Sequence, residues 1–212
     1  MSVRAVFRNP YVWAFLIGIV TLTAIRPLLR RVPEPPPVLF QLPEFSLVAA
    51  DGKPFGSAEL RGQVYVASFF FTSCRSICPA IMHGMTRLQD GFARNEVSGV
   101  RLVSISVDPG HDTPEVLADY GKTLGVDPGR WTLLTGDPEQ VRRIVVFGFK
   151  TPDVAASAGV EPMDIAHTGK LVLVDGAGRV RGYYGSDEMG LDEVFNRAQH
   201  VLREGREGKR PG

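Results

Sequence analysis

Apolar and polar residues alternate in blocks along the chain, and these blocks predict strands and helices in turn. Two continuous apolar runs, residues 63–71 and 100–107, are typical of central strands buried on both faces of a sheet. Between them, apolar residues recur at helical spacing after Pro79, a residue that favours the first turn of a helix. The members of this apolar face are Ile81, Met82, Met85, Leu88 and Phe92.

The rest of the chain continues in the same way. Thr113 and Asp137 each precede a proline and predict the N-caps of two helices. The remaining elements are expected at residues 45–55 (a hairpin with an Asp-Gly turn), 113–124 (helix), 131–134 (strand), 138–147 (helix), 171–184 (hairpin) and 191–202 (helix). Strands that alternate with helices predict an α/β fold, a mixed sheet with helices on both faces.

The N-terminal segment has a different pattern. Residues 9–25 carry no charge and lie between Arg8 and Arg26, and a membrane-spanning helix needs about 17 to 20 apolar residues. We therefore expect residues 1–31 to form a single membrane anchor. A cleaved signal peptide is the alternative, but no small-x-small cleavage site follows the apolar run. The prolines of residues 32–44 predict an extended linker, residues 45–203 a single domain, and residues 204–212 a disordered tail.

Composition narrows the classes of function. The net charge is +1 and 44% of the residues are hydrophobic, which fits an ordinary packed domain. Basic residues are scattered and do not interleave with aromatic ones, so nothing argues for a nucleic-acid partner.

Cys74 and Cys78, the only cysteines, follow the first apolar strand. Sites in such sheets gather at the carboxyl ends of strands. Two cysteines four residues apart at a helix start share one face, and a helix N-terminus favours thiolates. Such a pair can bind a soft metal, copper above all, or cycle as a disulfide. A structural disulfide or two buried thiols is the plain alternative.

Other potential ligands lie far away in the sequence. His167 precedes the last hairpin, at the end of a loop of about twenty residues, and can complete a set of three ligands. Asp108 and Asp164 are candidates for orienting a bound histidine, and Met163 for a thioether ligand. The side chains expected in the core, in a turn or on the surface are Met82, Met85, Trp131, His83, His111 and His200.

Three ordered motifs together carry a family resemblance. They are residues 71–79 around the cysteines, residues 103–109 with 112–115, and residues 166–168 leading into 171–175. From about residue 45 to 202 the chain resembles the Sco/SenC copper chaperones of cytochrome c oxidase assembly. The resemblance implies a thioredoxin-like fold in which Cys74, Cys78 and His167 bind copper. Arg75-Ser76 replaces the Pro-Asp of many family members, which favours thiolates and disulfide chemistry.

The resemblance and the residues together predict a function. We expect a monomeric, membrane-anchored protein on the periplasmic side of a bacterial inner membrane, or in an equivalent oxidising compartment. It would deliver copper to the dinuclear copper centre of a cytochrome oxidase subunit. The alternative is a thiol–disulfide reductase in which Cys74 attacks and Cys78 resolves. A peroxiredoxin-type enzyme is disfavoured, because Thr72 and Cys74 are too close for the Thr-x-x-Cys motif.

Overall fold

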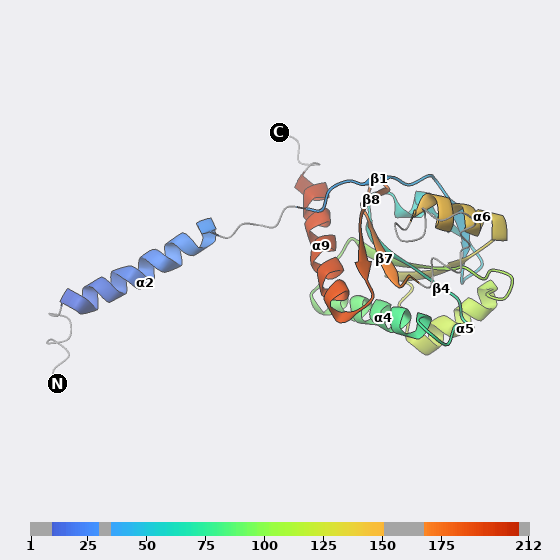
Figure 1. The fold of residues 1–212 in the computed structure, drawn as a ribbon, viewed down its shortest axis with the longest axis horizontal. Coiled ribbons are helices and arrows are strands. Elements are labelled where there is room, and N and C mark those ends of the chain that lie inside the picture. The colour runs from blue at the N-terminus through green and yellow to red at the C-terminus, as the bar shows by residue number, and fades with distance from the viewer. Residues whose placement is uncertain (1–9, 30–34, 151–167, 208–212) are drawn as a thin grey trace. The chain divides into compact units, whose positions relative to one another are not determined.

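The computed structural model describes residues 10–29, 35–150 and 168–207 (Figure 1). Two units are distinguished, one up to Glu34 and one from Pro35 onward. In the first, α2 (Pro10–Leu29) is a helix of 20 residues. Within the described ranges, no helix combines the length and the apolar character that a membrane crossing needs. The membrane anchor expected at residues 1–31 therefore stays a prediction.

The described strands of the second unit form one eight-stranded mixed sheet. Its parallel centre is β4 (Val64–Phe70), β5 (Val100–Ser106) and β6 (Trp131–Thr135). On one side, β7 (Lys170–Val174), β8 (Arg179–Gly185) and β1 (Phe40–Gln41) follow, each antiparallel to its neighbour. On the other side lies the hairpin of β2 (Ser46–Ala49) and β3 (Pro54–Gly56). The order is β1-β8-β7-β4-β5-β6-β2-β3.

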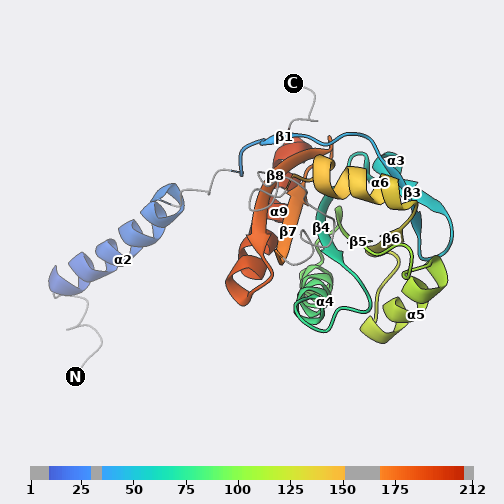
Figure 2. The same cartoon turned by 45° about the vertical axis from the view of Figure 1, so that its right-hand side comes forward.

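Helices cover both faces of this sheet, as predicted (Figures 1 and 2). One face packs against α4 (Cys78–Arg94), α5 (Pro114–Leu124) and α9 (Glu188–Glu207) around Phe70 and Trp131. The other packs against α3 (Ser57–Leu60), α6 (Pro138–Arg142) and the π-helical η1 (Arg143–Gly148) around Phe69. Every residue of β4 is buried, which explains its unbroken apolar sequence.

The predicted helix caps are confirmed. The Thr113 hydroxyl accepts a hydrogen bond from the Val116 amide, and the Asp137 carboxylate accepts from two amides of the first turn of α6. These bonds satisfy amides that have no partner inside the helix. The helix expected at residues 138–147 continues beyond α6 only as the wider π-helical turns of η1.

The segment expected as a linker, residues 32–44, packs against the folded unit over much of its described length. Pro36 is buried, and its carbonyl accepts a hydrogen bond of 2.8 Å from Nε of Arg181. The Leu39 amide donates to the Val180 carbonyl at 2.8 Å, and β1 then pairs with β8. The folded unit thus begins near Pro35 because Arg181, distant in sequence, provides a buried donor to a proline-rich segment.

The C-terminus also differs from expectation. A disordered tail was expected from Glu204, but α9 continues to Glu207. Glu204 forms an ion pair of 2.6 Å with Arg181, whose side chain is only 3% exposed. This pair holds the last turns of α9 against the sheet, and residues 208–212 lie outside the described part of the chain.

Candidate metal and thiol site

The two cysteines lie where the sequence predicts, directly after β4. The Cys74 amide donates to the Phe71 carbonyl at 3.2 Å, which closes a turn, and Cys78 is the first residue of α4. Both are free thiols. Cys74 is 9% exposed and Cys78 is 1% exposed, so a reagent or a partner reaches the pair from the side of Cys74.

The environment of Cys74 favours its thiolate. Burial alone would raise the pKa of Cys74, but hydrogen bonds from the Cys78 thiol, the Ser76 hydroxyl and the amides of both residues lower it to about 7. The Ser76 oxygen lies 3.4 Å from the Cys74 sulfur. Because α4 begins four residues later, the positive end of its dipole acts in the same direction.

Cys78 has the opposite character. Burial raises the pKa of Cys78 to about 12, and its hydrogen bond to Cys74 and the negative charges of Cys74 and Asp112 add to this effect. One sulfur of the pair is therefore half ionised at neutral pH, whereas the other keeps its proton.

A buried carboxylate, Asp112, fixes the loop that carries Cys74. Asp112 is fully buried and accepts hydrogen bonds from the Thr72 amide at 3.0 Å, from the Thr72 hydroxyl and from the Ser106 hydroxyl. It thereby joins the end of β4 to the connection between β5 and α5. Asp112 belongs to the motif of residues 112–115, but the sequence alone does not reveal this role. A charged residue directly before the N-cap Thr113 was the available signal.

An aromatic wall adjoins the thiols. The ring of Tyr120 on α5 stacks on Phe70, the last residue of β4, with centroids 5.6 Å apart. Burial raises the pKa of Tyr120, and the negative charges of Cys78, Asp112 and Cys74 raise it further. The phenol therefore stays neutral near the sulfurs.

His167, the expected third ligand, lies outside the described residues, as do Met163 and Asp164. The description resumes at Thr168, and β7 begins at Lys170. Because β7 runs antiparallel to β4, its first residues lie at the carboxyl end of β4, the edge that carries the cysteines. A Cβ atom built on Gly169 would lie 2.9 Å from the Ile77 side chain, so Gly169 packs beside the start of α4.

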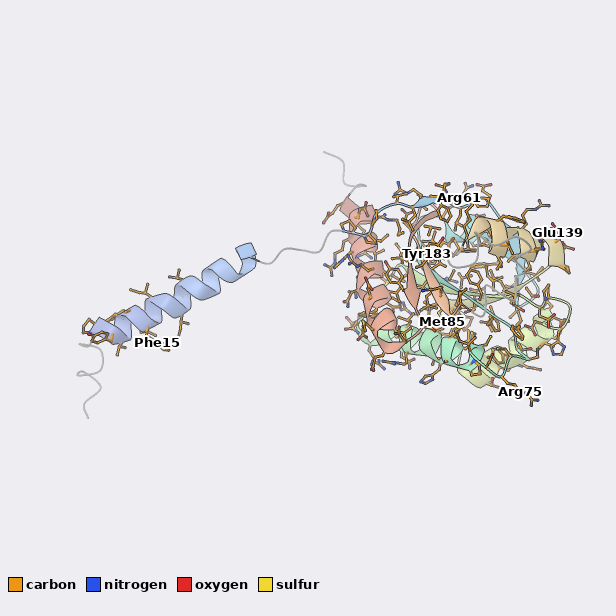
Figure 3. All side chains as sticks on the ribbon, viewed as in Figure 1. Phe15, Arg61, Arg75, Met85, Glu139 and Tyr183 are labelled. Carbon is orange, nitrogen blue, oxygen red and sulfur yellow. The ribbon has the colours of Figure 1, made fainter. Side chains whose placement is uncertain are left out.

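The other candidates take structural positions. Met82, Met85 and Trp131 are fully buried in the core, as expected (Figure 3 labels Met85). The Asp108 carbonyl accepts amides of the turn that leads to Asp112, which agrees with a turn role.

His83 and His111 are exposed. His200 is half-buried instead of exposed, and burial with two nearby arginines lowers its pKa. Arg75 is exposed beside the cysteines (Figure 3).

The described residues do not by themselves complete a metal site. Among them, no group of three histidine, cysteine or acidic side chains is close enough to hold an ion. The two sulfurs thus provide two ligands of the soft type, and a third must come from elsewhere.

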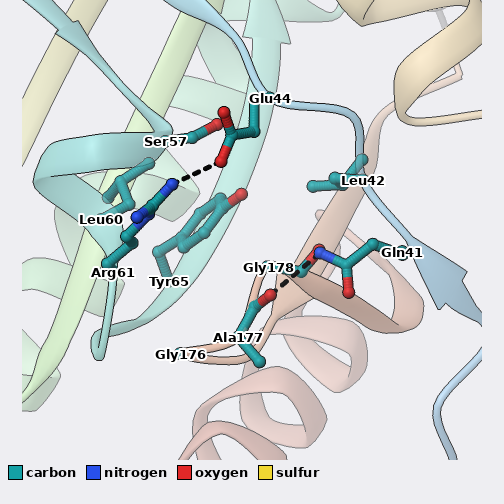
Figure 4. A pocket seen from close by; sticks show the side chains of 10 residues that line it. All are labelled: Gln41, Leu42, Glu44, Ser57, Leu60, Arg61, Tyr65, Gly176, Ala177 and Gly178. Carbon is teal, nitrogen blue, oxygen red and sulfur yellow. Dashed lines mark hydrogen bonds and ion pairs between the residues drawn. The ribbon is translucent and has the colours of Figure 1, made fainter.

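A cavity of about 360 Å³ lies at the other end of β4, away from the thiols (Figure 4). Tyr65 forms one wall, and the Arg61–Glu44 ion pair lies at its rim. Because Tyr65 is near the start of β4 and the cysteines follow its end, this cavity is separate from the thiol site.

The chain matches one known protein family over most of its length. A family model described as SCO1/SenC matches residues 39–203. The chain belongs to the SCO1/SenC family. The SCO1 protein homolog of Bacillus subtilis is 28% identical over 161 residues, which cover 76% of this chain and 82% of the relative.

Solved structures of SCO1/SenC relatives agree with this assignment. BsSco, described as a member of the Sco family of cytochrome c oxidase assembly proteins with a disulfide switch, matches with a TM-score of 0.68 and 27% identity, over 80% of this chain and 98% of BsSco. ScoI of Arabidopsis thaliana, solved with copper bound, matches with a TM-score of 0.57 and 25% identity, over 78% of this chain and 98% of ScoI. The thioredoxin-like fold predicted from the sequence is confirmed.

Proposed function

We propose that this protein is a copper chaperone that binds copper as cargo through Cys74, Cys78 and His167 and delivers it to the dinuclear copper centre of a cytochrome oxidase subunit. The observation that carries this proposal is the pair of free, nearly buried thiols at the start of α4. Membership of the SCO1/SenC family and a relative solved with copper bound support it.

The chemistry of the donor atoms fits Cu(I). Thiolates and imidazole are ligands that copper accepts readily, and thiolates favour the reduced ion. With a pKa of about 7, half of Cys74 is already thiolate at neutral pH. Only Thr168 separates His167 in sequence from Gly169, which packs against Ile77 beside Cys78. This proximity supports His167 as the third ligand.

Delivery requires that an acceptor thiolate reach the ion. Cys74 is the more exposed of the two sulfurs, so an incoming thiolate displaces Cys74 first and Cys78 afterwards. Such stepwise exchange keeps the copper bound throughout the transfer. Arg75 is exposed beside Cys74, so its guanidinium can form an ion pair with an acidic side chain of the acceptor.

A second function, thiol–disulfide reduction, is favoured by the difference in acidity between the cysteines. The Cys74 thiolate attacks an acceptor disulfide, forms a mixed disulfide and releases one acceptor thiolate. Cys78 then loses its proton and attacks the Cys74 sulfur, which releases the second acceptor thiolate and leaves a Cys74–Cys78 disulfide. A low pKa in the attacking thiol and a high one in the resolving thiol suit this order.

We further propose that residues 1–31 anchor the protein in the inner membrane, with the SCO1/SenC domain on its periplasmic side. The uncharged run of residues 9–25 supports this location. Alkaline carbonate extraction of membranes tests it: the full chain should stay in the pellet, whereas a chain that starts at Pro35 should not. Recovery of both in the supernatant would contradict the anchor.

Anaerobic titration of the reduced protein with Cu(I) against a competing chelator tests copper binding. The expected result is one tightly bound copper per chain, lost in Cys74→Ser and Cys78→Ser and weakened in His167→Ala. His83→Ala is the matched control, because His83 is exposed on α4. Equal stoichiometry and affinity in His167→Ala and the unmodified protein would remove His167 from the ligand set.

The same His167→Ala variant separates the two functions. Disulfide exchange does not need an imidazole ligand, so reduction of a model disulfide by His167→Ala should match that by the unmodified protein. In the reductase function, Cys78→Ser should trap the mixed disulfide on Cys74. Tight copper binding in the unmodified protein, with no mixed disulfide trapped in Cys78→Ser, would exclude the reductase function and keep copper delivery.

A further inference from the structure

Figure 2 shows α5 and the β2–β3 hairpin on the same side of the folded unit. A groove separate from the thiols is lined by residues of both elements. Its volume is about 660 Å³, within the range of about 300 to 1,000 Å³ that is usual for sites of small molecules. The apolar side chains that line it include Phe55, Leu117, Val126, Trp131 and Leu133. Trp131 begins β6, so the groove opens toward the amino ends of the strands, opposite the cysteines.

Arg101 adds one unpaired charge to this apolar lining. The other cations of the groove have partners: Lys53 pairs with Asp51, and Lys122 pairs with Asp119, each at 2.8 Å. Arg101 is half-buried and forms no ion pair in the described ranges. Its Nη2 donates to the Thr132 hydroxyl at 3.3 Å, and its Nε is buried without a hydrogen-bond partner.

The acidic residues of the groove do not neutralise this charge. Asp51 is held by Lys53, and the Glu59 carboxylate accepts the Gly56 amide at 2.7 Å. The Arg101 guanidinium lies over the Phe55 ring, 6.0 Å from its centroid, a contact that orients the cation but leaves its charge in place. A buried donor without an acceptor destabilises the protein. A ligand that places a hydrogen-bond acceptor at Arg101 would remove this penalty, which favours its binding.

We propose that this groove binds an aliphatic monocarboxylate, a single apolar chain that ends in one carboxylate, as in a fatty acid. The chain lies on the apolar side chains and loses its contact with water, which drives binding. The carboxylate lies at Arg101, whose planar guanidinium can donate two hydrogen bonds to its two oxygens. The site is independent of copper and of the cysteines.

Trp131 makes the site observable. The chain has two tryptophans, and Trp13→Phe in the full-length protein leaves Trp131 as the only one. The probe is dodecanoate, titrated below its critical micelle concentration, with Trp131 fluorescence as the signal. We expect a saturable change, and dodecanol, which has the same chain without the charge, should bind about tenfold more weakly or worse.

Variants separate the charge from the apolar lining. In Arg101→Gln, dodecanoate affinity should fall about tenfold or more and become equal to that for dodecanol. Arg94→Gln, an exposed arginine on α4, is the matched control and should bind as the parent does. Ala118→Phe, which fills the groove, should abolish binding of both probes. Circular dichroism verifies that each variant is folded.

Three results would overturn the proposal. One is the lack of a saturable signal with dodecanoate in the parent protein. Another is equal affinity of the parent for dodecanoate and dodecanol. The third is binding that a folded Arg101→Gln leaves unchanged. If Arg101→Gln does not fold, Ala118→Phe decides, because unchanged dodecanoate binding in that variant places the ligand elsewhere.

Discussion

Replacement of Ser76 by alanine should make Cys74 a weaker nucleophile at neutral pH. The Ser76 hydroxyl lies 3.4 Å from the Cys74 sulfur and helps to lower the pKa of Cys74 to about 7. A hydrogen bond to a charged group contributes about 1.5 kcal/mol, and one pKa unit corresponds to about 1.4 kcal/mol, so its loss should raise this pKa by about one unit.

The direction of the effect on rate follows from the ionised fraction. With a pKa of about 7, half of Cys74 is thiolate at pH 7. If the pKa is one unit higher, only about a tenth of Cys74 is thiolate at pH 7. Alkylation by iodoacetamide at pH 7 should therefore slow about fivefold in Ser76→Ala. The rate should rise with pH through the pKa in both proteins, and the two curves should meet at high pH. Mass spectrometry of the cysteine peptide separates Cys74 from Cys78.

Neighbouring variants test the cause of this effect. Cys78→Ala should raise the pKa of Cys74 more than Ser76→Ala does, because the Cys78 thiol is the strongest of the stabilising donors, whereas Cys78→Ser keeps a hydroxyl donor. Ser73→Ala, an exposed neighbour, is the matched control. An alkylation profile of the unmodified protein centred near 9, or one that Ser76→Ala and Cys78→Ala leave in place, would refute the reasoning.

Two further predictions concern buried charges and are measured by chemical denaturation. Asp112→Asn puts an amide against the Thr72 donors and should lower the free energy of unfolding by about 1 to 3 kcal/mol, whereas the exposed Asp119→Asn should change it by less than about 0.5 kcal/mol. Asp175→Ala removes the buried partner of Arg181 and should lower the free energy of unfolding by about 3 to 5 kcal/mol. Glu204→Ala should lower it by less, because Arg181 keeps its contacts with Asp175 and Pro36. Equal losses in the members of either pair would contradict these assignments.

The sequence predicted the elements whose signals are local. The strand before Cys74, the caps at Thr113 and Asp137, and the placement of both cysteines at a strand end follow from patterns within a few residues. The packing of Met82 and Met85 also followed, because an apolar face at helical spacing must be buried.

Features that depend on contacts between residues far apart in the sequence were not predicted. The residues from Pro36 onward read as a spacer because their anchor, Arg181, is 145 positions away. Glu204 read as part of a tail for the same reason, since its partner is again Arg181. The role of Asp112 depends on Thr72 and Ser106, which only the folded sheet brings beside it.

The unequal acidity of the two thiols has a consequence for proton balance. A cation coordinated by both sulfurs at pH 7 must expel the Cys78 proton and, on average, half a proton from Cys74, because their pKa values are about 12 and about 7. Loading is therefore linked to the acidity of the compartment, with between one and two protons exchanged for each ion. Acidification opposes loading and favours release, so the fraction of the protein that carries the ion depends on the pH of the compartment that holds the thiols.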